Sequence, residues 1–321
     1  MLSTEKYMKQ IIPPIDRNLI LGELTAERFI RDTNKGSNQI YLITAHNAPN
    51  TMREIGRIRE LSFRLGGGGC GEELDVDEFD YMEKPYKQLV VWNPHDREII
   101  GGYRFLHGRD MKIKPDGQPL IVTEHMFHFS DEFLKNYLPY TIDLGRAFVH
   151  PDYQSTQIHT KSIFAFDNLW DGLLVIPFFE PDTRYIIGKI TIYPQYDEMA
   201  RNAIFYFMNK FLGDSKGLLV CKDVFFDKNS AASPEIEAIF DGHDVEENYN
   251  KLVQFVRKRG INIPPLINSY YKLSSTMKVF GTGINREFGD IYDTGTMVTA
   301  SEINPDKVSR HIDSFLKGLH K

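Results

Sequence analysis

The order of strand-like and helix-like segments most restricts the fold that this chain can adopt. Strands are predicted where apolar and β-branched residues cluster, at 39–45, 87–92, 98–106, 140–149, 184–193, 277–281 and 289–301. Helices are predicted where apolar residues recur at helical spacing, at 50–66, 158–176, 196–213 and 264–275. The turn sequence NPHDR joins the second and third strands as a hairpin. Interspersed strands and helices predict an α/β or α+β fold with a mixed central sheet flanked by helices.

Length and composition allow one large domain or two small ones. Of the 321 residues, 41% are hydrophobic, which suffices for a substantial core. We expect a helical N-terminal extension over residues 1–36, because segment 16–32 has an amphipathic spacing. The main domain is expected over 37–300, with a polar helical insertion at about 213–263, and a C-terminal tail helix is expected over 301–321.

Charge and cysteine usage exclude several classes of protein. The formal charge of −6 argues against a nucleic-acid-binding protein. The two cysteines, Cys70 and Cys221, provide neither a disulfide framework nor a CxxC metal site, and they fit a reducing cytoplasm. The first residues lack the apolar core of a signal peptide, and no run of eighteen apolar residues occurs. We therefore expect a cytoplasmic protein, with peripheral attachment to the inner face of the cell membrane left open.

Motifs for metal binding and nucleophilic catalysis are weak. His125 and His128 have an HxxH spacing, but the HExxH motif of zinc enzymes and a third ligand are missing. No GxSxG motif occurs, and neither cysteine has a histidine close to it in the sequence. We therefore expect no metal site and no serine or cysteine nucleophile.

A glycine run at 66–71, GGGGCG, follows the first predicted helix. Gly66 and Gly71 have the spacing of a phosphate-binding P-loop, but Glu72 and Glu73 occupy the positions of its lysine and its Ser/Thr. Carboxylates there repel phosphates, and a helix rather than a strand is predicted before the run. The run is therefore either a flexible loop or a turn that brings the carboxylates of DVDEFD over a site.

Charged residues stand at positions where the local pattern alone does not call for them. Charges in strand interiors are costly unless they are paired or face a cleft. A surface position or a structural salt bridge explains each of them taken singly. Together they predict one charged network beside the sheet. The residues are Arg59, Asp77, Asp80, Arg104, Asp143 and Arg146.

The spacing of Asp143 and Arg146 predicts an irregularity in their strand. Residues three apart in a regular strand point to opposite faces, so the two side chains would diverge. One extra residue in a β-bulge would bring both to the same face, and Gly145 suits such a position. We therefore predict a bulge at Leu144–Gly145.

The same residues resemble the motifs of a known enzyme family. The chain contains an RxxxF pair (Arg59, Phe63), a DxxD pair (Asp77, Asp80), the strand GGYRFL with Arg104, and the segment DLGRAFVHPDY. This set resembles the acyl-homoserine-lactone synthases. It resembles still more closely the hemolysin-like N-acyltransferases of bacterial aminolipid synthesis, which acylate ornithine or glycine. The C-terminal segment from IPPLINSYYKL to FGDIYDTG also resembles the latter family, and the resemblance extends over about residues 39–300.

The resemblance implies a GNAT-like acyl-CoA N-acyltransferase fold, with a bulged fourth strand that splays from its neighbour. It implies transfer of a fatty acyl (3-hydroxyacyl) group from acyl carrier protein to the amine of glycine or ornithine in aminolipid biosynthesis. No cofactor would be bound permanently. The donor would be the acyl-phosphopantetheine of acyl carrier protein, or acyl-CoA, and the partners would be the carrier protein and the amino-acid acceptor.

The resemblance also implies roles for the matched residues. Asp143 would take the proton of the acceptor amine, directly or through water, and Arg146 or Arg104 would bind the acceptor carboxylate. These three are the expected catalytic residues. Substrate binding is expected from the others, which are Arg59, Phe63, Asp77, Asp80 and Phe148.

Two departures from the family pattern bear on the mechanism and the donor. Asp143 stands where the family usually has the longer glutamate, and a bridging water would make up the difference in length during proton transfer. The sequence YQSTQIHTKS at 153–162 replaces the glycine-containing loop with which acetyl-CoA-dependent GNAT enzymes hold pyrophosphate. A helix start there would still suit one phosphate, and the missing glycines favour a carrier-protein donor over CoA.

Three alternative functions remain beside this one. A small-molecule N-acetyltransferase would use acetyl-CoA and have a short acyl pocket. A signal synthase of the homoserine-lactone type fits the C-terminal half less well than the aminolipid family does. A non-catalytic or haemolytic protein would have no use for the charged network, and the sequence offers no pore-forming segment.

Overall fold

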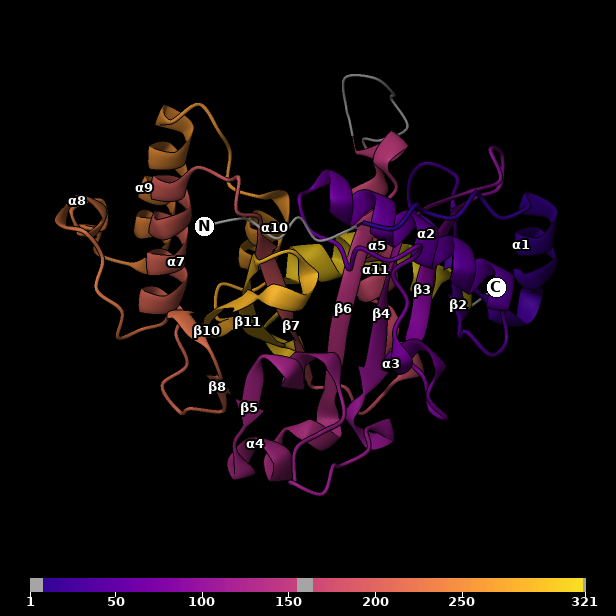
Figure 1. Ribbon diagram of the computed structural model, residues 1–321, viewed down its shortest axis with the longest axis horizontal. Coiled ribbons are helices and arrows are strands. Elements are labelled where there is room, and N and C mark those ends of the chain that lie inside the picture. Colours follow the sequence, from indigo (N-terminus) through magenta and orange to yellow (C-terminus); the bar gives the residue numbers. More distant parts are fainter. Residues whose placement is uncertain (1–7, 155–163, 320–321) are drawn as a thin grey trace. The chain divides into compact units, whose positions relative to one another are not determined.

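The computed structural model describes residues 8–154 and 164–319 (Figure 1). The chain divides into two compact units, each assembled from segments that are distant in the sequence. Unit 1 consists of Met1–Asp110, Leu144–Asp182 and Pro305–Lys321, and unit 2 consists of Met111–Asp143 and Thr183–Asn304. The domain boundaries that we placed at residues 36 and 300 stay predictions.

The sheet of unit 1 has the strand order β1-β2-β3-β4-β6. Neighbours from β1 to β4 pair antiparallel, and the predicted hairpin at 87–106 is confirmed as the pair β3–β4. Strands β3 and β4 are buried along almost their whole length, so any charge inside them needs a partner. The bounds are β1 Phe29–Asp32, β2 Gln39–Ile43, β3 Lys87–Asn93, β4 Glu98–His107 and β6 Thr141–Val149, the last lying in unit 1 from Leu144 onward.

Helices of unit 1 come from all three of its segments (Figure 1). The longest in the first segment, α2, buries an apolar stripe that includes Ile55 and Ile58, as its spacing predicts. The α-helices are α1 Arg17–Glu23, α2 Pro49–Leu65, α3 Glu78–Tyr81, α5 Ala165–Leu173, α6 Ile176–Phe179 and α11 Pro305–Leu319. Short 3-10 helices are η1 Ala26–Arg28, η2 Gly108–Asp110 and η5 Pro151–Tyr153.

We had expected a helical N-terminal extension, but the described part of it is not helical throughout. Within 8–36 the α-helix covers only Arg17–Glu23, and Phe29–Asp32 forms the strand β1 against β2. The backbone groups of 29–32 bond to β2, and the side chain of Arg31 is buried, where it donates to the His311 carbonyl at 2.6 Å. Pairing with the neighbouring strand thus decides the conformation of a segment whose local pattern suits a helix equally well.

Helix α2 begins two or three residues earlier than its local sequence suggests. Asn50 or Thr51 would be ordinary N-caps, but the N-cap is Ala48 and Pro49 is the first helical residue. The carboxylate of Glu23 accepts the N–H groups of Asn50 at 3.0 Å and Thr51 at 2.7 Å. A side chain from α1 therefore satisfies the free N–H groups of α2.

Unit 2 contains an antiparallel sheet in the order β7-β11-β10-β9 and a separate pair, β5–β8. Its strands are β5 Phe127–Phe129, β7 Tyr185–Ile192, β8 Leu219–Cys221, β9 Val224–Phe226, β10 Lys278–Asn285 and β11 Ile291–Thr299. Its α-helices are α4 Asp131–Asn136, α7 Glu198–Phe211, α8 Pro234–Glu237, α9 Val245–Lys258 and α10 Pro265–Leu273. Short 3-10 helices are η3 Val122–His125, η4 Leu138–Tyr140, η7 Arg286–Phe288 and η8 Ala300–Glu302.

The polar segment at 213–263 is only partly the helical insertion that we predicted. It contributes helices α8 and α9, but also the strands β8 and β9, and β9 pairs with β10. Aromatic side chains bind its longer helix to the rest of unit 2. Tyr249 of α9 stacks on Tyr271 of α10 with ring centroids 3.9 Å apart, and Phe207 of α7 packs against both rings. Tertiary pairing again overrides a weak local pattern.

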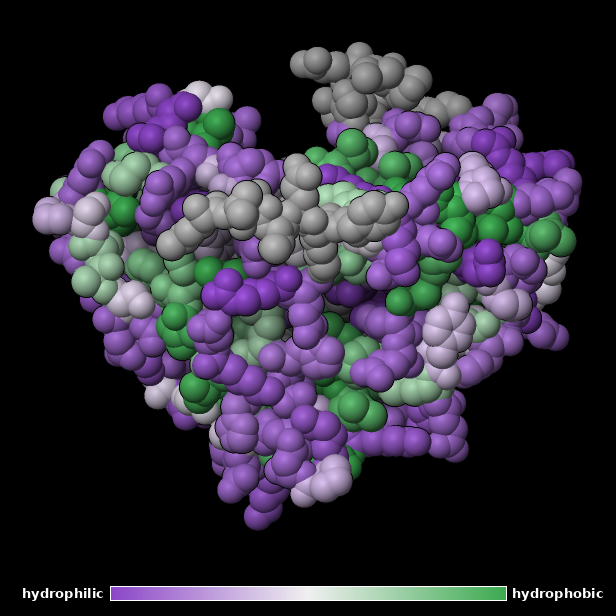
Figure 2. All heavy atoms as spheres, in the orientation of Figure 1, coloured by the Kyte–Doolittle hydropathy of each residue, from purple (hydrophilic) through white to green (hydrophobic). Residues whose placement is uncertain are grey.

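The predicted α/β class, with mixed sheet structure and flanking helices, is confirmed. In the face shown in Figure 2, hydrophilic residues predominate and hydrophobic residues occur in small groups between them. Within the described residues, no helix is both long enough and apolar enough to cross a bilayer.

Candidate active site

Four of the charged residues singled out in the sequence meet in unit 1. Arg104 of β4 holds both carboxylate oxygens of Asp77, at 2.7 and 2.6 Å, and lies 2.9 Å from Asp80. Arg59 of α2 lies 3.4 Å from the same oxygen of Asp80. Both arginines and Asp80 are completely buried, and Asp77 is the member that reaches solvent, with 28% of its side chain exposed. Four members of the predicted charged network therefore pair with one another.

Gln88 completes the buried part of this network, and we did not predict it. Its side-chain N–H donates to Asp80 at 2.8 Å, and its carbonyl oxygen accepts a hydrogen bond from Arg59. In the β3–β4 hairpin Gln88 lies directly opposite Arg104. The available signal was a polar amide inside the apolar strand KQLVVW, where burial demands a hydrogen-bonding partner.

Arg146 extends the network to a further carboxylate, that of Asp75. The Nε of Arg146 donates to Asp75 at 2.9 and 3.2 Å, and its Nη2 lies 3.7 Å from Asp77. Asp75 is almost completely buried, and it too was missed, although it belongs to the conspicuous DVDEFD segment. Three guanidinium groups thus face three carboxylates, and their charges balance.

The network keeps the carboxylate of Asp77 ionised. Burial raises the pKa of Asp77, but the charge of Arg104 and its hydrogen bonds, with Arg146 and Arg59, lower that pKa to about 2. Burial lowers the pKa of the Arg104 guanidinium, whereas Asp80 and Asp77 raise it further, and the result lies well above its usual value. Burial lowers the pKa of Arg59 despite the opposing effect of Asp80. Arg104 is therefore the electrostatic centre of the cluster.

Asp77 and Asp80 also form the capping box of the short helix α3. Asp77 accepts the Phe79 N–H at 3.1 Å, and Asp80 accepts the Asp77 N–H at 3.3 Å. The two carboxylates therefore fix the backbone that carries them while they bind the arginines. The DxxD spacing, noted as a motif, has this local structural consequence.

The glycine run is an ordered turn, held by a residue that we did not predict. The buried carboxylate of Glu60 accepts the N–H groups of Cys70 at 3.0 Å and Gly71 at 2.8 Å. Gly67, Gly69 and Gly71 have φ values of 89°, 103° and 81°, which favour glycine. Burial raises the pKa of the Cys70 thiol to about 12, so this cysteine stays protonated. Of the two interpretations, the turn that brings in DVDEFD is supported.

Phe63 and Phe148, expected to bind substrate, are buried in unit 1. The Arg59 guanidinium lies 5.9 Å from the centroid of the Phe148 ring. A Cβ at Gly101 would lie 2.5 Å from the Phe148 carbonyl oxygen, and one at Gly102 would lie 3.2 Å from its ring. The two glycines of GGYRFL therefore permit the close approach of Phe148. The substrate-binding role of both phenylalanines stays a prediction.

Asp143 is buried in unit 2, where its carboxylate accepts a hydrogen bond from the Thr123 hydroxyl. It lies on β6, the strand that also carries Arg146. The bulge at Leu144–Gly145 stays a prediction, but Arg146 has a φ of 50°, a left-handed conformation inside the strand.

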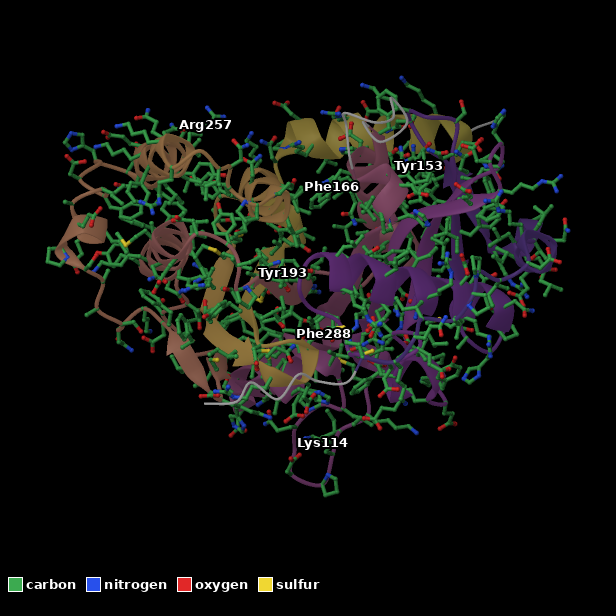
Figure 3. The ribbon with its side chains drawn as sticks, turned by 45° about the horizontal axis from the view of Figure 1, so that its top comes forward. Lys114, Tyr153, Phe166, Tyr193, Arg257 and Phe288 are labelled. Atoms are coloured by element: carbon green, nitrogen blue, oxygen red, sulfur yellow. The ribbon has the colours of Figure 1, made fainter. Side chains whose placement is uncertain are left out.

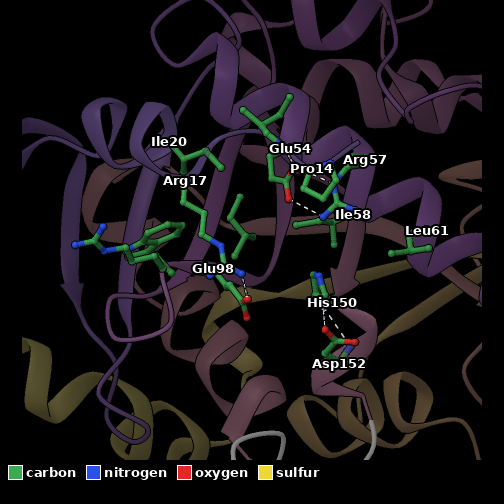
Figure 4. A pocket seen from close by; sticks show the side chains of 14 residues that line it. Pro14, Arg17, Ile20, Glu54, Arg57, Ile58, Leu61, Glu98, His150 and Asp152 are labelled. Atoms are coloured by element: carbon green, nitrogen blue, oxygen red, sulfur yellow. Dashed lines mark hydrogen bonds and ion pairs between the residues drawn. The ribbon is translucent and has the colours of Figure 1, made fainter. Parts of the chain in front are cut away.

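A cavity of about 300 Å³ in unit 1 was not predicted from the sequence (Figure 4). Its apolar wall includes Trp92, and His150, whose pKa is lowered by burial, lies at its edge. Ion pairs join its charged residues, as between Arg57 and Glu54 at 2.6 Å. Three arginines and three carboxylates line it, so it carries no net charge that would select an ionic ligand.

Other expectations concern metal and phosphate. Within 8–154 and 164–319, the structure contains no group of three or more His, Cys, Asp or Glu side chains suited to a metal ion. Most of the segment 153–162, where a helix start was expected to receive a phosphate, lies outside the described residues.

A family model and two relatives agree on the type of enzyme. Residues 58–163 match the family described as acetyltransferase (GNAT) domain. A glycine N(alpha)-acyltransferase of Bacteroides thetaiotaomicron is 49% identical over 97% of this chain and 91% of its own length. Another, from Phocaeicola vulgatus, is 48% identical over 97% of this chain and 94% of its own. A solved CoA-dependent acyl-homoserine lactone synthase is 9% identical over 86% of this chain and 89% of its own, with a TM-score of 0.36.

The GNAT match spans the residues from Arg59 to Arg146, so the expected GNAT fold is confirmed for the part of the chain that carries the network. The two bacterial relatives extend the similarity over nearly the whole sequence. The chain belongs to the family of these two enzymes, and it is a GNAT-type N-acyltransferase.

Proposed function

We propose that this N-acyltransferase moves a fatty acyl group from a thioester donor to the amine of glycine. The observation that carries the proposal is the near full-length identity of 49% and 48% to two enzymes named for glycine. Ornithine, which the sequence resemblance left open, is the second acceptor to test. The 3-hydroxyacyl chain and the role in aminolipid biosynthesis are part of the same proposal.

The proposed donor is the acyl-phosphopantetheine of acyl carrier protein, with acyl-CoA as the alternative. Both present the same thioester on a pantetheine arm, so the chemistry of the transfer is identical. The absence of glycine from YQSTQIHTKS supports the carrier protein, because the pyrophosphate of CoA requires a closer backbone approach. A product with a fatty tail partitions into lipid, which supports a cytoplasmic enzyme that contacts the inner face of the cell membrane.

The reaction needs a base, and we propose Asp143 for that role. Its carboxylate accepts the proton of the acceptor ammonium, directly or through water, while the Thr123 hydroxyl holds it in place. The free amine then attacks the thioester carbonyl, the C–N bond forms, and the C–S bond breaks. The departing pantetheine sulfur takes the proton that the attacking nitrogen loses as it becomes an amide, and leaves as a thiol. Backbone N–H groups of β6 are proposed to stabilise the oxyanion.

The arginines have a positioning role in this proposal. Arg104 is engaged by Asp77 and Arg146 by Asp75, so an acceptor carboxylate would have to displace an aspartate from either guanidinium. Their contacts instead hold the segment from Asp75 to Asp80 against β4 and β6. Through Arg146 the network also holds the part of β6 that lies in unit 1, from Leu144 onward.

The test is an assay of the purified protein with matched donors and acceptors. Myristoyl or 3-hydroxypalmitoyl carrier protein, the corresponding acyl-CoA and acetyl-CoA are each incubated with glycine or ornithine, and products are identified by mass spectrometry. We expect N-acylglycine from a long-chain donor. Acetylglycine alone would favour the acetyltransferase alternative, and no acylated amino acid with any donor would overturn the proposal.

Substitution of Asp143 tests the proposed base within the same assay. Asp143→Asn keeps the size of the side chain but cannot accept a proton, so kcat should fall by a factor of about 10² to 10⁴. Asp152→Asn, which changes an exposed carboxylate on η5, is the matched control and should keep wild-type rates. Full activity of Asp143→Asn, with wild-type thermal stability, would remove Asp143 from the mechanism.

A further inference from the structure

A partly buried lysine in unit 2 has no role in the mechanism described so far. Lys189 lies inside β7, and 14% of its side chain is exposed. Its ammonium lies 3.3 Å from Asp293 of β11 and 3.8 Å from the sulfur of Met126. Figure 3 labels Tyr193, which directly follows β7, and Phe288, which lies between β10 and β11. A cation on an interior strand is costly to keep unless it binds something.

The carboxylate of Asp293 does not depend on Lys189 for its hydrogen bonds. The Thr191 hydroxyl donates to one oxygen at 2.6 Å, and the Asn285 amide donates to the other at 3.0 Å. Asp293 therefore has two neutral donors that hold it in place, and the lysine adds a charge at a longer distance. The second contact of the ammonium is a thioether, which is a weak acceptor. A carboxylate ligand would be a far stronger partner than this sulfur.

The segment that contacts Lys189 also contacts the proposed base. Thr123 donates to Asp143, and Met126, three residues later, touches the Lys189 ammonium. Most of the segment is the 3-10 helix η3, which rises about 2 Å per residue, so the two contacts begin about 6 Å apart along the chain. A glycine molecule measures only about 3.6 Å from its amine nitrogen to a carboxylate oxygen, but with a hydrogen bond of about 2.8 Å at each end it can bridge a separation of this size.

From these contacts we infer that Lys189 binds the carboxylate of the amino-acid acceptor and thereby selects amino acids over simple amines. The inference rests on the proposed function, and it names the side chain that recognises the acceptor of the proposed reaction. It assigns carboxylate capture to unit 2, which also holds Asp143, instead of to Arg104 or Arg146. The acceptor carboxylate would replace the Met126 sulfur beside the ammonium, while Asp293 keeps the lysine oriented.

The test compares two acceptors that differ only in the charge recognised. Glycine has a carboxylate, and glycinamide has the same amine without it. In Lys189→Met, kcat/KM for glycine should fall about 10- to 150-fold, as for a lost charged hydrogen bond, mainly through KM. For glycinamide, kcat/KM should stay within about threefold of the wild type. Lys189→Arg should recover part of the preference for glycine.

Lys222→Met is the matched control. Lys222 is also a lysine of unit 2 that pairs with a carboxylate, that of Glu124, but it is more exposed. Its loss should leave unchanged the ratio of kcat/KM for glycine to kcat/KM for glycinamide. If Lys189→Met lost activity equally toward glycine and glycinamide, or kept the wild-type ratio, the inference would be wrong while the proposed function stood. If the wild type acylated no amino acid, the inference about Lys189 and the proposed function would both be wrong.

Discussion

At the scale of single residues, a few buried ion pairs dominate the electrostatics of unit 1. Arg104 holds Asp77 with two hydrogen bonds and shares Asp80 with Arg59. A buried guanidinium is stable only while its carboxylates remain, so loss of one partner costs about 3–5 kcal/mol. Arginine suits this position because its planar fork matches a carboxylate, which a lysine ammonium does not.

The lowered pKa of Asp77 predicts that the stability of the fold decreases at acidic pH. The pKa falls from 3.8 to about 2 in the folded protein, so the ionised carboxylate stabilises the fold above about pH 4. This contribution, about 2 kcal/mol, is lost as the pH falls from about 4 towards 2. Asp77→Asn keeps an N-cap for α3 but has no proton to gain.

Urea unfolding at pH 6 and pH 3 measures this effect. Wild type should lose about 1–2 kcal/mol more stability between the two pH values than Asp77→Asn does. The same loss in both proteins would show that Asp77 is not held ionised by Arg104.

At the scale of structural elements, the glycine turn after α2 connects the helix of Arg59 to the segment of Asp75 and Asp77. Its order depends on the buried Glu60, which accepts two backbone N–H groups of the turn and a hydrogen bond from Arg64 at 2.7 Å. A flexible linker would place these aspartates at no defined distance from the arginines. The turn is therefore part of the site's construction.

Gly69→Ala tests the close fit of this turn. The new Cβ would require a left-handed alanine, which costs about 1–2 kcal/mol, and it would lie 3.2 Å from both oxygens of Glu60. Gly117→Ala is the matched control, since Gly117 has a φ of 82° but nothing within 4 Å of its Cβ position. Chemical unfolding should show a loss for Gly69→Ala that exceeds that of the control by about 1 kcal/mol. Equal losses would mean that Glu60 does not constrain the turn.

At the scale of the whole molecule, each unit is built from segments far apart in the sequence. In unit 1, the C-terminal helix α11 is tied to the N-terminal strand and to α5. His311 Nδ1 lies 2.7 Å from the Asp171 carboxylate, and the His311 carbonyl accepts a hydrogen bond from Arg31. Asn34 donates to Asp171 as well, at 2.7 Å. This buried cluster explains why the tail helix belongs to the core of unit 1.

His311→Ala tests the attachment of the tail helix. It removes a partner of the buried Asp171, so the free energy of unfolding should fall by about 1–3 kcal/mol. His128→Ala, at an exposed position of β5, should change stability by less than about 0.5 kcal/mol. Guanidinium unfolding followed by circular dichroism measures the free energy of unfolding of both variants. Equal stability of the two would contradict the attachment of α11 through His311.

Much of the fold follows from local pattern. The β3–β4 hairpin and the helices α2 and α7 were predicted because burial of one face imposes a period of two or of 3.6 on apolar residues. The strands β1, β8 and β9 were missed because short segments with weak periodicity take the conformation that a neighbouring strand offers.

The sequence by itself determined which charges were out of place and therefore needed partners, such as Arg104 in an apolar strand. Only the tertiary structure decided the partners. Asp75, Gln88 and Glu60 acquire their roles from contacts with residues 10 to 71 positions away. Burial makes a partner obligatory, which is visible in one segment, but the partner's identity depends on distances through space that no single segment encodes.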